Sequence, residues 1–231
     1  MNYSFIIFCY NEEHNLIRVY ERLKAFCSRS HSEHEIIIVD DGSTDGTPDI
    51  CKKLKEENPG IIVITHAVNA GIGLALRSGY EAATREYVCA IPGDGQFDIE
   101  ELNAVRPFTK ETFYSFYRPQ TNYNSYRKLL TWLNRLFNQH ILGLYLRDVN
   151  WVKVYRREHL MITAPVLRSS LIESEICAKL NRMGIMPIEI PSVYHPRQSG
   201  KAKGGSWNTL RKALAETLKL WWLVVTFKPR K

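Results

Sequence analysis

Acidic, amide and glycine residues follow each of four short apolar runs in the first hundred residues. The runs have the length and composition of buried β-strands, and the polar groups stand at their ends. Ligands of open parallel sheets bind beyond the carboxyl ends of the strands, so the pattern predicts one binding site along this edge. The four polar groups are Cys9-Tyr10-Asn11-Glu12-Glu13, Asp40-Asp41-Gly42-Ser43, Asn69-Ala70-Gly71-Ile72-Gly73 and Pro92-Gly93-Asp94-Gly95-Gln96.

Two of these groups have the chemistry to hold a nucleotide. Asp40 and Asp41 could accept hydrogen bonds from a nucleobase N–H or from ribose hydroxyls, although Asp, like the Ser43 beside them, is also favoured as a helix cap. The Gly71-Ile72-Gly73 turn precedes a predicted helix, whose amino terminus could receive phosphate. The turn lacks the dinucleotide fingerprint and the P-loop lysine, so a simple tight turn is an equal interpretation.

The fourth group, around Asp94 and Gln96, could hold a metal ion. Glycines on both sides of Asp94 let the backbone approach a ligand closely. One carboxylate and one amide oxygen form an incomplete set of hard ligands, which suits Mg²⁺ or Mn²⁺ with phosphates and water in the remaining positions. A turn favoured by Gly and Asp is the structural alternative.

The elements that must position these residues alternate regularly between strand and helix. This alternation with short connections predicts an α/β fold with a mostly parallel sheet covered by helices. The predicted strands of this part are Tyr3–Cys9, Glu35–Val39, Ile61–Thr65 and Tyr87–Ile91, with helices over 16–27, 47–57 and 74–84.

The second half of the chain is less regular. It predicts strands at Phe113–Tyr117, Val152–Tyr155 and Met186–Ile190, and helices at Tyr126–Leu146, Leu171–Met183 and Asn208–Phe227. No linker is visible, so we expect a catalytic domain over 1–206 and a peripheral amphipathic helix with a basic tail over 207–231, in one structural unit.

The composition bounds the class of protein. The 231 residues carry a net charge of +7, which indicates an anionic partner: nucleic acid, an anionic membrane or a phosphorylated substrate. The five scattered cysteines fit a reducing compartment and no structural zinc site. Acidic residues directly after the first apolar run argue against a signal peptide, and no apolar stretch has the ~20 residues of a spanning helix.

As a set, seven motifs resemble the GT-A glycosyltransferases of family 2, particularly the polyprenol-phosphate (dolichol-phosphate) mannose synthase branch. They are CYNEE, IIIVDDGSTDGT, NAGIGLALRSGYEAA, IPGDGQFD, LRDVNWVKVYRR, IESEICAKL and HPRQSGKAKGG, in order over most of residues 3–215. The resemblance implies a GT-A, Rossmann-like fold and a UDP- or GDP-linked sugar donor.

The resemblance also implies site residues. Asp94 and Gln96 occupy the metal-facing positions of the DxD-type loop, with Mg²⁺ or Mn²⁺ as cofactor, while Pro92 replaces the first acid of that motif. The residues expected to bind the nucleotide sugar are Tyr10, Asn11, Glu12, Asp40, Asp41, Ser43, Asn69, Gly71, Pro92, Gly93 and Asp94.

On the acceptor side, the resemblance implies that Arg118, Arg127 and Arg197 hold the phosphate of a polyprenyl phosphate and, with Asp94, act in catalysis. Guanidinium groups bind phosphate in a two-pronged way, although each arginine alone could be a solvated surface charge. A phosphate monoester is anionic near neutral pH and needs no general base, and in-line displacement inverts the anomeric configuration.

Three acids could orient the sugar or act as a base for a hydroxyl acceptor: Asp148, Glu173 and Glu175. The structural alternatives are a helix-start charge for Glu173 and an ion pair of Asp148 with Arg147 or Arg156. Two other functions therefore stay open, a family 2 transferase acting on a hydroxyl of a saccharide or lipid and, remotely, a non-catalytic nucleotide-binding protein. No motif for nucleic-acid binding is present.

The predicted last helix has the pattern of a helix that lies on a membrane surface. Basic residues flank its apolar side, as in helices that rest among anionic headgroups, although packing on the core is the alternative. We therefore expect a protein on the cytoplasmic face of a membrane. The apolar side carries Trp207, Leu210, Leu214, Leu218, Trp221, Trp222 and Val225.

Overall fold

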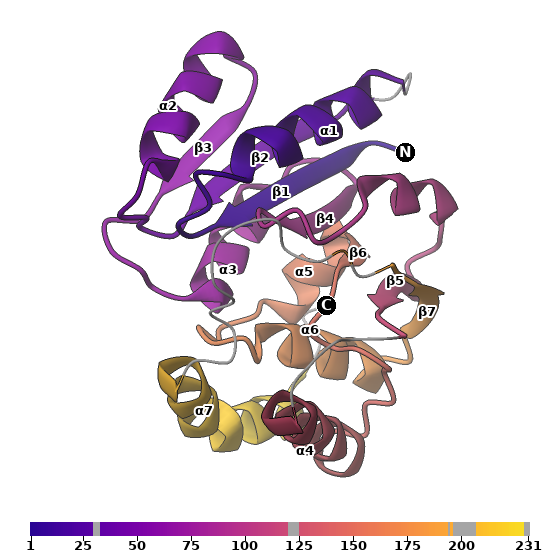
Figure 1. Cartoon of the computed structure of the whole chain (residues 1–231). Helices are drawn as coiled ribbons and strands as arrows, with labels where there is room; N and C mark the ends of the chain where they lie inside the picture. The colour runs from indigo at the N-terminus through magenta and orange to yellow at the C-terminus, as the bar shows by residue number, and fades with distance from the viewer. Residues whose placement is uncertain (30–32, 120–124, 194, 196–206, 229–231) are drawn as a thin grey trace.

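We describe the fold from a computed structural model of the chain, shown in Figure 1. The structure describes residues 1–29, 33–119, 125–193, 195 and 207–228, without the side chains of 125–128, 130 and 207–214. The strands are β1 (Tyr3–Cys9), β2 (Glu35–Asp40), β3 (Ile62–Thr65), β4 (Tyr87–Pro92), β5 (Thr112–Tyr117), β6 (Lys153–Arg156) and β7 (Met186–Pro191). The helices are α1 (Leu16–Ser28), α2 (Thr47–Glu57), α3 (Ile72–Ala82), the 3₁₀ helix η1 (Ile99–Ala104), α4 (Ser125–Ile141), α5 (Arg157–Thr163), α6 (Ile172–Arg182) and α7 (Trp207–Val225).

The described strands form a seven-stranded sheet in the order β3-β2-β1-β4-β6-β5-β7. All neighbouring pairs are parallel except those of β6, which runs antiparallel to β4 and β5. The predicted mostly parallel α/β sheet is confirmed. The carboxyl ends of β1, β2, β3 and β4 therefore meet at one edge.

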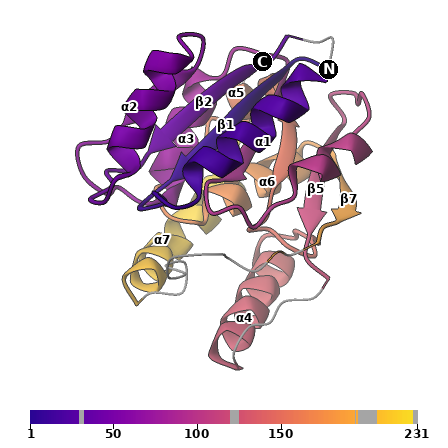
Figure 2. The same cartoon turned by 45° about the horizontal axis from the view of Figure 1, so that its top comes forward.

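Helices cover both faces of the sheet, because alternate residues of each parallel strand point to opposite faces. In β2, Ile36 and Ile38 pack under α1 and α2, whereas Ile37 and Val39 pack against α3 and α6. Figure 2 shows α1 and α2 on the near face of the strands, with α3 behind them. The result is a three-layer α/β/α arrangement.

Three features of the second half were not predicted from the sequence: the antiparallel direction of β6, the seven-residue helix α5 and the 3₁₀ helix η1. Both helical segments are short, so their hydrophobic periodicity is weak. The direction of a four-residue strand is set by its pairing and leaves no periodic signal in the sequence.

Helices α4 and α7 lie together at the end of the molecule farthest from α2, the lower end in Figure 1. On α7, Leu220 and Val224 are buried in the core beside α6, while its other side faces outward. Among the described helices, none is both long and apolar enough to cross a bilayer.

Candidate functional site at the carboxyl edge of the sheet

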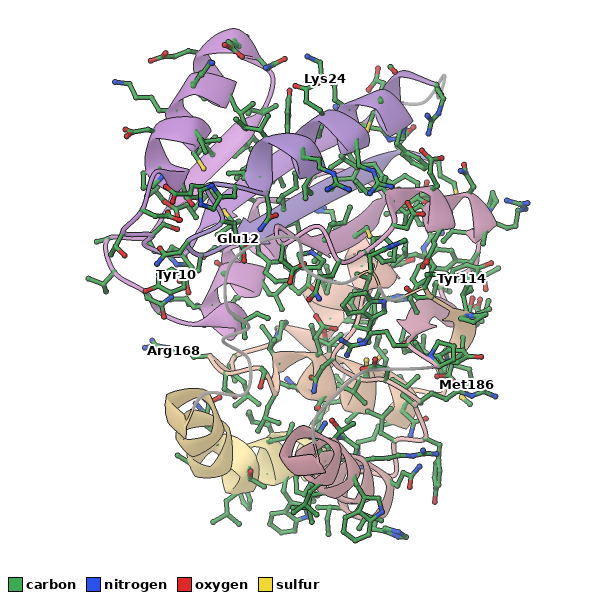
Figure 3. The ribbon with its side chains drawn as sticks, in the orientation of Figure 1. Tyr10, Glu12, Lys24, Tyr114, Arg168 and Met186 are labelled. Atoms are coloured by element: carbon green, nitrogen blue, oxygen red, sulfur yellow. The ribbon has the colours of Figure 1, made fainter. Side chains whose placement is uncertain are left out.

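The loops after β1 and β2 are joined by side chains that the sequence pattern singled out. Asn11 adopts a left-handed backbone conformation (φ 54°). Its side-chain oxygen accepts a hydrogen bond from the Thr44 backbone amide (2.8 Å). Its own amide donates to the Ser43 hydroxyl (2.9 Å). The buried Glu12 accepts from the side chain of Asn15 (2.7 Å). Asn11 and Glu12 thus help to build the edge, where Figure 3 shows Tyr10 beside them.

Asp41 builds the turn that follows β3. One carboxylate oxygen accepts a hydrogen bond from the Ala70 backbone amide (3.0 Å) and lies 2.8 Å from His66 Nδ1. The other oxygen accepts a hydrogen bond from the Gly71 backbone amide (2.8 Å). The other nitrogen of the His66 ring lies 3.0 Å from the Ser78 hydroxyl. These contacts tie the ends of β2 and β3 to the start of α3, and Asn69 stands exposed in the same turn.

Asp40 has a different environment from its neighbour. It is fully buried, and its Oδ1 accepts from the amide and the hydroxyl of Ser43 (3.1 and 2.5 Å). Its Oδ2 is buried without a hydrogen-bond partner among the described residues. Of the two aspartates, Asp40 therefore keeps unused acceptor capacity next to the strand end.

The loop after β4 holds Asp94 and Gln96. The Gly93 amide donates to the Phe8 carbonyl (2.9 Å), which fixes the loop beside β1. Asp94 accepts from the Gln96 amide (3.0 Å). Gln96 also makes two hydrogen bonds with the backbone of His195. The Gln96 side-chain nitrogen donates to the His195 carbonyl (3.3 Å), and the His195 amide donates to the Gln96 backbone carbonyl (3.2 Å).

This donor set fits a divalent metal ion as part of a shared site. Asp94 offers a carboxylate and Gln96 an amide oxygen, both hard ligands suited to Mg²⁺ or Mn²⁺. Within the described part of the chain, no group of three or more His, Cys, Asp and Glu residues could hold a metal alone. The protein would thus supply two ligands, and phosphate oxygens and water would complete the coordination.

Two of the residues expected on the acceptor side, Arg118 and Asp148, form a second cluster. Arg118, at the end of β5, donates through Nε and Nη2 to the two oxygens of Asp148 (2.7 and 3.2 Å). The guanidinium carbon of Arg118 lies 4.2 Å from the centroid of the Trp151 ring. The partner of Asp148 is therefore Arg118, whereas Arg147 pairs with Glu189 and Arg156 with Glu86 and Glu158.

One segment connects the two clusters. The Trp151 indole nitrogen donates to the Ser192 hydroxyl (2.8 Å), the Val193 amide donates to Glu101 (2.6 Å), and His195 binds Gln96. Ser192 thus contacts the Arg118 cluster, and His195, three positions later, contacts the Asp94 loop. Arg197 itself lies outside the described residues, and Arg127 lies in α4 where its side chain is not described.

Glu173 is engaged deep inside the fold. It accepts from the hydroxyls of Tyr80 (2.6 Å) and Tyr155 (2.7 Å), and Lys153 lies 3.5 Å away. Burial, and then the Glu173 carboxylate, raise the pKa of Tyr80, so that its hydroxyl stays a donor. Glu173 is thus a member of a buried network rather than an exposed helix-start charge.

Glu175 is also engaged inside the fold. It is fully buried, pairs with Lys179 (2.5 Å) and accepts from the amides of Val166 and Leu167. Neither glutamate reaches the strand-end edge in this arrangement.

Sequence reasoning did not single out Lys153, Trp151, His66 and His195. A signal existed for Lys153, since a lysine inside the apolar run Val152–Tyr155 must find buried partners. It donates to the carbonyls of Val149 (2.5 Å) and Trp151 (3.0 Å) and so holds the turn that carries Asp148. No sequence signal marked the two histidines, because their partners come from distant segments.

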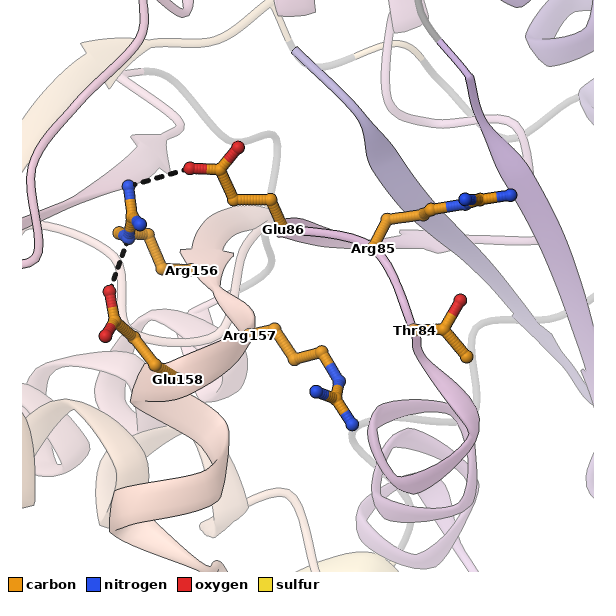
Figure 4. A pocket seen from close by; sticks show the side chains of 6 residues that line it. All are labelled: Thr84, Arg85, Glu86, Arg156, Arg157 and Glu158. Carbon is orange, nitrogen blue, oxygen red and sulfur yellow. Dashed lines mark hydrogen bonds and ion pairs between the residues drawn. The ribbon is translucent and has the colours of Figure 1, made fainter.

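The pocket in Figure 4 is not part of this site. It has a volume of about 250 Å³ and lies at the amino-terminal end of β4, whereas the Asp94 loop follows the carboxyl end of that strand. Arg156 pairs there with Glu86 and Glu158, so much of the charge lining the pocket is neutralised within it. The residues that line it are Thr84, Arg85, Glu86, Arg156, Arg157 and Glu158.

Known proteins of similar sequence are glycosyltransferases. The chain is 26% identical over 224 residues to the polyprenol monophosphomannose synthase of Mycolicibacterium smegmatis, covering 90% of this chain and 83% of that protein. It is 26% identical over 213 residues to the undecaprenyl-phosphate mannosyltransferase of Micrococcus luteus, covering 86% and 85%. An uncharacterized glycosyltransferase of Nostoc sp. is 35% identical over 105 residues, but the match spans only 46% of this chain and 32% of that protein.

The fold agrees with these similarities. Glucosyl-3-phosphoglycerate synthase from Mycobacterium tuberculosis, crystallised with Mn²⁺, UDP-glucose and phosphoglyceric acid, superposes with a TM-score of 0.66 at 15% identity, covering 96% of this chain and 80% of that one. The same protein has been crystallised with Mg²⁺ and UDP. The family model "Glycosyl transferase family 2" matches residues 4–162, more than half of the sequence. The chain is therefore a member of glycosyl transferase family 2, a glycosyltransferase with the GT-A fold.

Proposed function

We propose that this enzyme transfers a sugar from a nucleoside-diphosphate sugar to a polyprenyl phosphate at a membrane surface. The observation that supports the proposal is that Ser192 contacts Trp151 of the Arg118 cluster while His195, three positions later, contacts Gln96 of the Asp94 loop. Two relatives that the chain covers almost completely are named for transfer to polyprenol or undecaprenyl phosphate, which supports the same acceptor class here.

The proposed reaction needs no protein base. An oxygen of the lipid phosphate attacks the anomeric carbon, the bond from that carbon to the diphosphate breaks, and the nucleoside diphosphate leaves with both electrons of the bond. Asp94 and Gln96 would hold Mg²⁺ or Mn²⁺, which would stabilise the charge of the departing diphosphate. Asp40 and the turn after β3 would hold the nucleotide, UDP or GDP, and in-line attack would invert the anomeric configuration.

The environments of the acids favour a phosphate acceptor over a hydroxyl. Glu173 and Glu175 are buried and hydrogen-bonded within the fold, and Asp148 is paired with Arg118. We therefore do not expect any of these three carboxylates to take a proton from a bound hydroxyl. The guanidinium group of Arg118 also lies 4.2 Å from the centroid of the Trp151 ring, a cation–π contact that helps to fix its position.

The test replaces Arg118 by alanine and measures transfer to a short polyprenyl phosphate, donor hydrolysis and donor affinity in parallel. We expect transfer to fall about tenfold to a hundredfold with donor affinity nearly intact, since a charge-assisted hydrogen bond to phosphate contributes roughly 1.5–3 kcal/mol. Arg118→Lys should recover only part of the activity, because an ammonium cannot make a two-pronged contact.

The matched control is Arg147→Ala, which removes an exposed arginine that stacks on Tyr117 and pairs with Glu189. It should transfer normally. Normal transfer by Arg118→Ala, together with a dead Glu173→Gln that still folds, would instead support a hydroxyl acceptor.

The membrane part of the proposal rests on α4 and α7. Both helices expose tryptophan and leucine at the same end of the molecule: Trp132 is 55% exposed, Trp222 61% and Leu218 80%. Apolar and aromatic faces of this kind, with lysine nearby, are typical of helices that lie among lipid headgroups. Such a surface would bring the enzyme to the plane in which its proposed lipid acceptor lies.

A further inference from the structure

The carboxylate of Glu216, on helix α7, binds the loop before α6. Glu216 accepts from two consecutive backbone amides, those of Arg168 (3.2 Å) and Ser169 (2.9 Å), one with each oxygen. The Ser169 carbonyl then accepts from the Ile172 amide (3.2 Å) at the start of α6. Figure 3 shows Arg168 between α3 and α7. The position of this loop therefore depends on where α7 lies.

The same loop packs directly on the turn after β3. A Cβ atom on Gly73 would lie 2.5 Å from the Arg168 carbonyl oxygen and would also collide with the Ser169 carbonyl, so only glycine permits this approach. Gly71, two residues earlier, is held by the Asp41 carboxylate (2.8 Å). An unbroken series of contacts thus runs from α7 through the loop to the strand-end edge.

Helix α7 also packs on the core through apolar side chains. Among its described residues, Leu220 and Val224 are buried against the core, and the outward side carries Trp221, Trp222 and Leu218. The hydrogen bonds of Glu216 thus add a polar link between α7 and the backbone at residues 168–169 to this apolar packing.

We infer that Glu216 is a positioning residue that holds the Arg168–Ser169 backbone against the Gly71–Gly73 turn. The seating of α7 on the protein thereby sets the affinity of the sheet edge for a nucleoside diphosphate. The inference rests on the proposed function, because it takes the turn after β3 as part of the nucleotide site. Beyond the proposed function, the inference states that the position of helix α7 changes the affinity of the donor site for the nucleotide.

The experiment measures the Kd of UDP and of GDP, each with Mn²⁺, by calorimetry well below the melting temperature. Glu216→Ala should raise the Kd of the preferred nucleotide by about fivefold or more, a typical size for coupling between two sites. Glu216→Gln should lie between the wild type and Glu216→Ala, since its amide oxygen replaces one carboxylate oxygen while its NH2 group cannot accept from the second backbone amide. The control Lys219→Ala changes an exposed neighbour on α7 and should leave the Kd unchanged.

A second variant separates positioning from general stability. Gly73→Ala displaces the same loop from the other side and should raise the Kd similarly, and the double variant Gly73→Ala/Glu216→Ala should be no weaker than the weaker single variant. An unchanged Kd in Glu216→Ala, with or without a lower melting temperature, would overturn the inference alone. A wild-type protein that binds neither nucleotide would overturn the proposed function and this inference with it.

Discussion

At the scale of single residues, Asp94 is the carboxylate that we propose to hold the metal ion at the leaving group. It stands in the loop after β4, held beside β1 by the Gly93 amide, and accepts one hydrogen bond from the Gln96 amide. Because Pro92 occupies the place of a second acid, Asp94 is the one carboxylate of this loop that would face a divalent ion. We expect the metal to bind together with the nucleotide, whose phosphate oxygens complete its coordination.

Asp94→Asn keeps the shape of the side chain and removes its charge. It should lower transfer by about a hundredfold or more, because metal-assisted charge stabilisation contributes several kcal/mol. Excess EDTA should have the same effect on the wild type, and the melting temperature should hardly change. Asp49→Asn, at an exposed aspartate in the first turn of α2, is the matched control. Near-normal turnover by Asp94→Asn, or full activity in EDTA, would remove Asp94 from this role.

At the scale of elements, α4 and α7 each expose several large apolar side chains on their outward face. On α4, Leu129, Trp132 and Leu133 are about half exposed, and on α7 the outward residues include Trp222 and Leu218. Clusters of large apolar side chains on one end of a protein mark contact surfaces. The two helices together offer a broader apolar surface than α7 alone, which is the helix that the sequence pattern singled out.

The double variant Trp132→Ala/Trp222→Ala tests this surface on vesicles of phosphatidylcholine and phosphatidylglycerol. Its partitioning into the vesicle fraction should fall about tenfold or more, since burying one large apolar side chain contributes roughly 1.5–3 kcal/mol. Ile17→Ala, which trims an exposed apolar residue on α1, should partition like the wild type. A wild type that fails to float with vesicles would show that these faces do not bind lipid.

At the scale of the whole molecule, a buried polar network joins three elements behind the sheet. Glu173 of α6 receives hydrogen bonds from Tyr80 of α3 and from Tyr155 of β6, and Lys153 of β6 supplies the nearby positive charge. The Lys153 side chain is 1% exposed. The network thus connects the helical layer to the turn that carries Asp148 and Trp151.

Lys153→Met should therefore lower stability and acceptor binding together. Leaving Glu173 buried without its cation should cost about 3–5 kcal/mol of the free energy of unfolding, a large part of the ~5–15 kcal/mol typical of a domain. Denaturant unfolding measures the loss. Lys153→Met/Glu173→Gln should recover part of it, because the second change removes the stranded charge. A Lys153→Met protein as stable as the wild type would contradict this prediction, because it would mean that Lys153 does not compensate a buried charge on Glu173.

The sequence by itself determined the parallel half of the fold and the family. The continuous apolar run Glu35–Val39 can only be a strand buried on both faces, and β2 spans Glu35–Asp40. Polar residues directly after such strands must meet at one edge, since parallel strands all end on the same side. The motifs around Asp40, Asp94 and Asp148 were also enough to predict the family, because they are local in the chain.

Only the tertiary structure decided which partners these residues have. Asp40 and Asp41 are adjacent, yet Asp40 has a buried oxygen with no hydrogen-bond partner in the described part of the chain, while Asp41 builds the turn at Gly71. Asp148 meets Arg118 from thirty residues away, and Glu216 meets Ser169 from forty-seven. Hydrogen bonds, burial and the direction of β6 depend on how distant segments pack, and packing leaves no periodic trace in the sequence around any one residue.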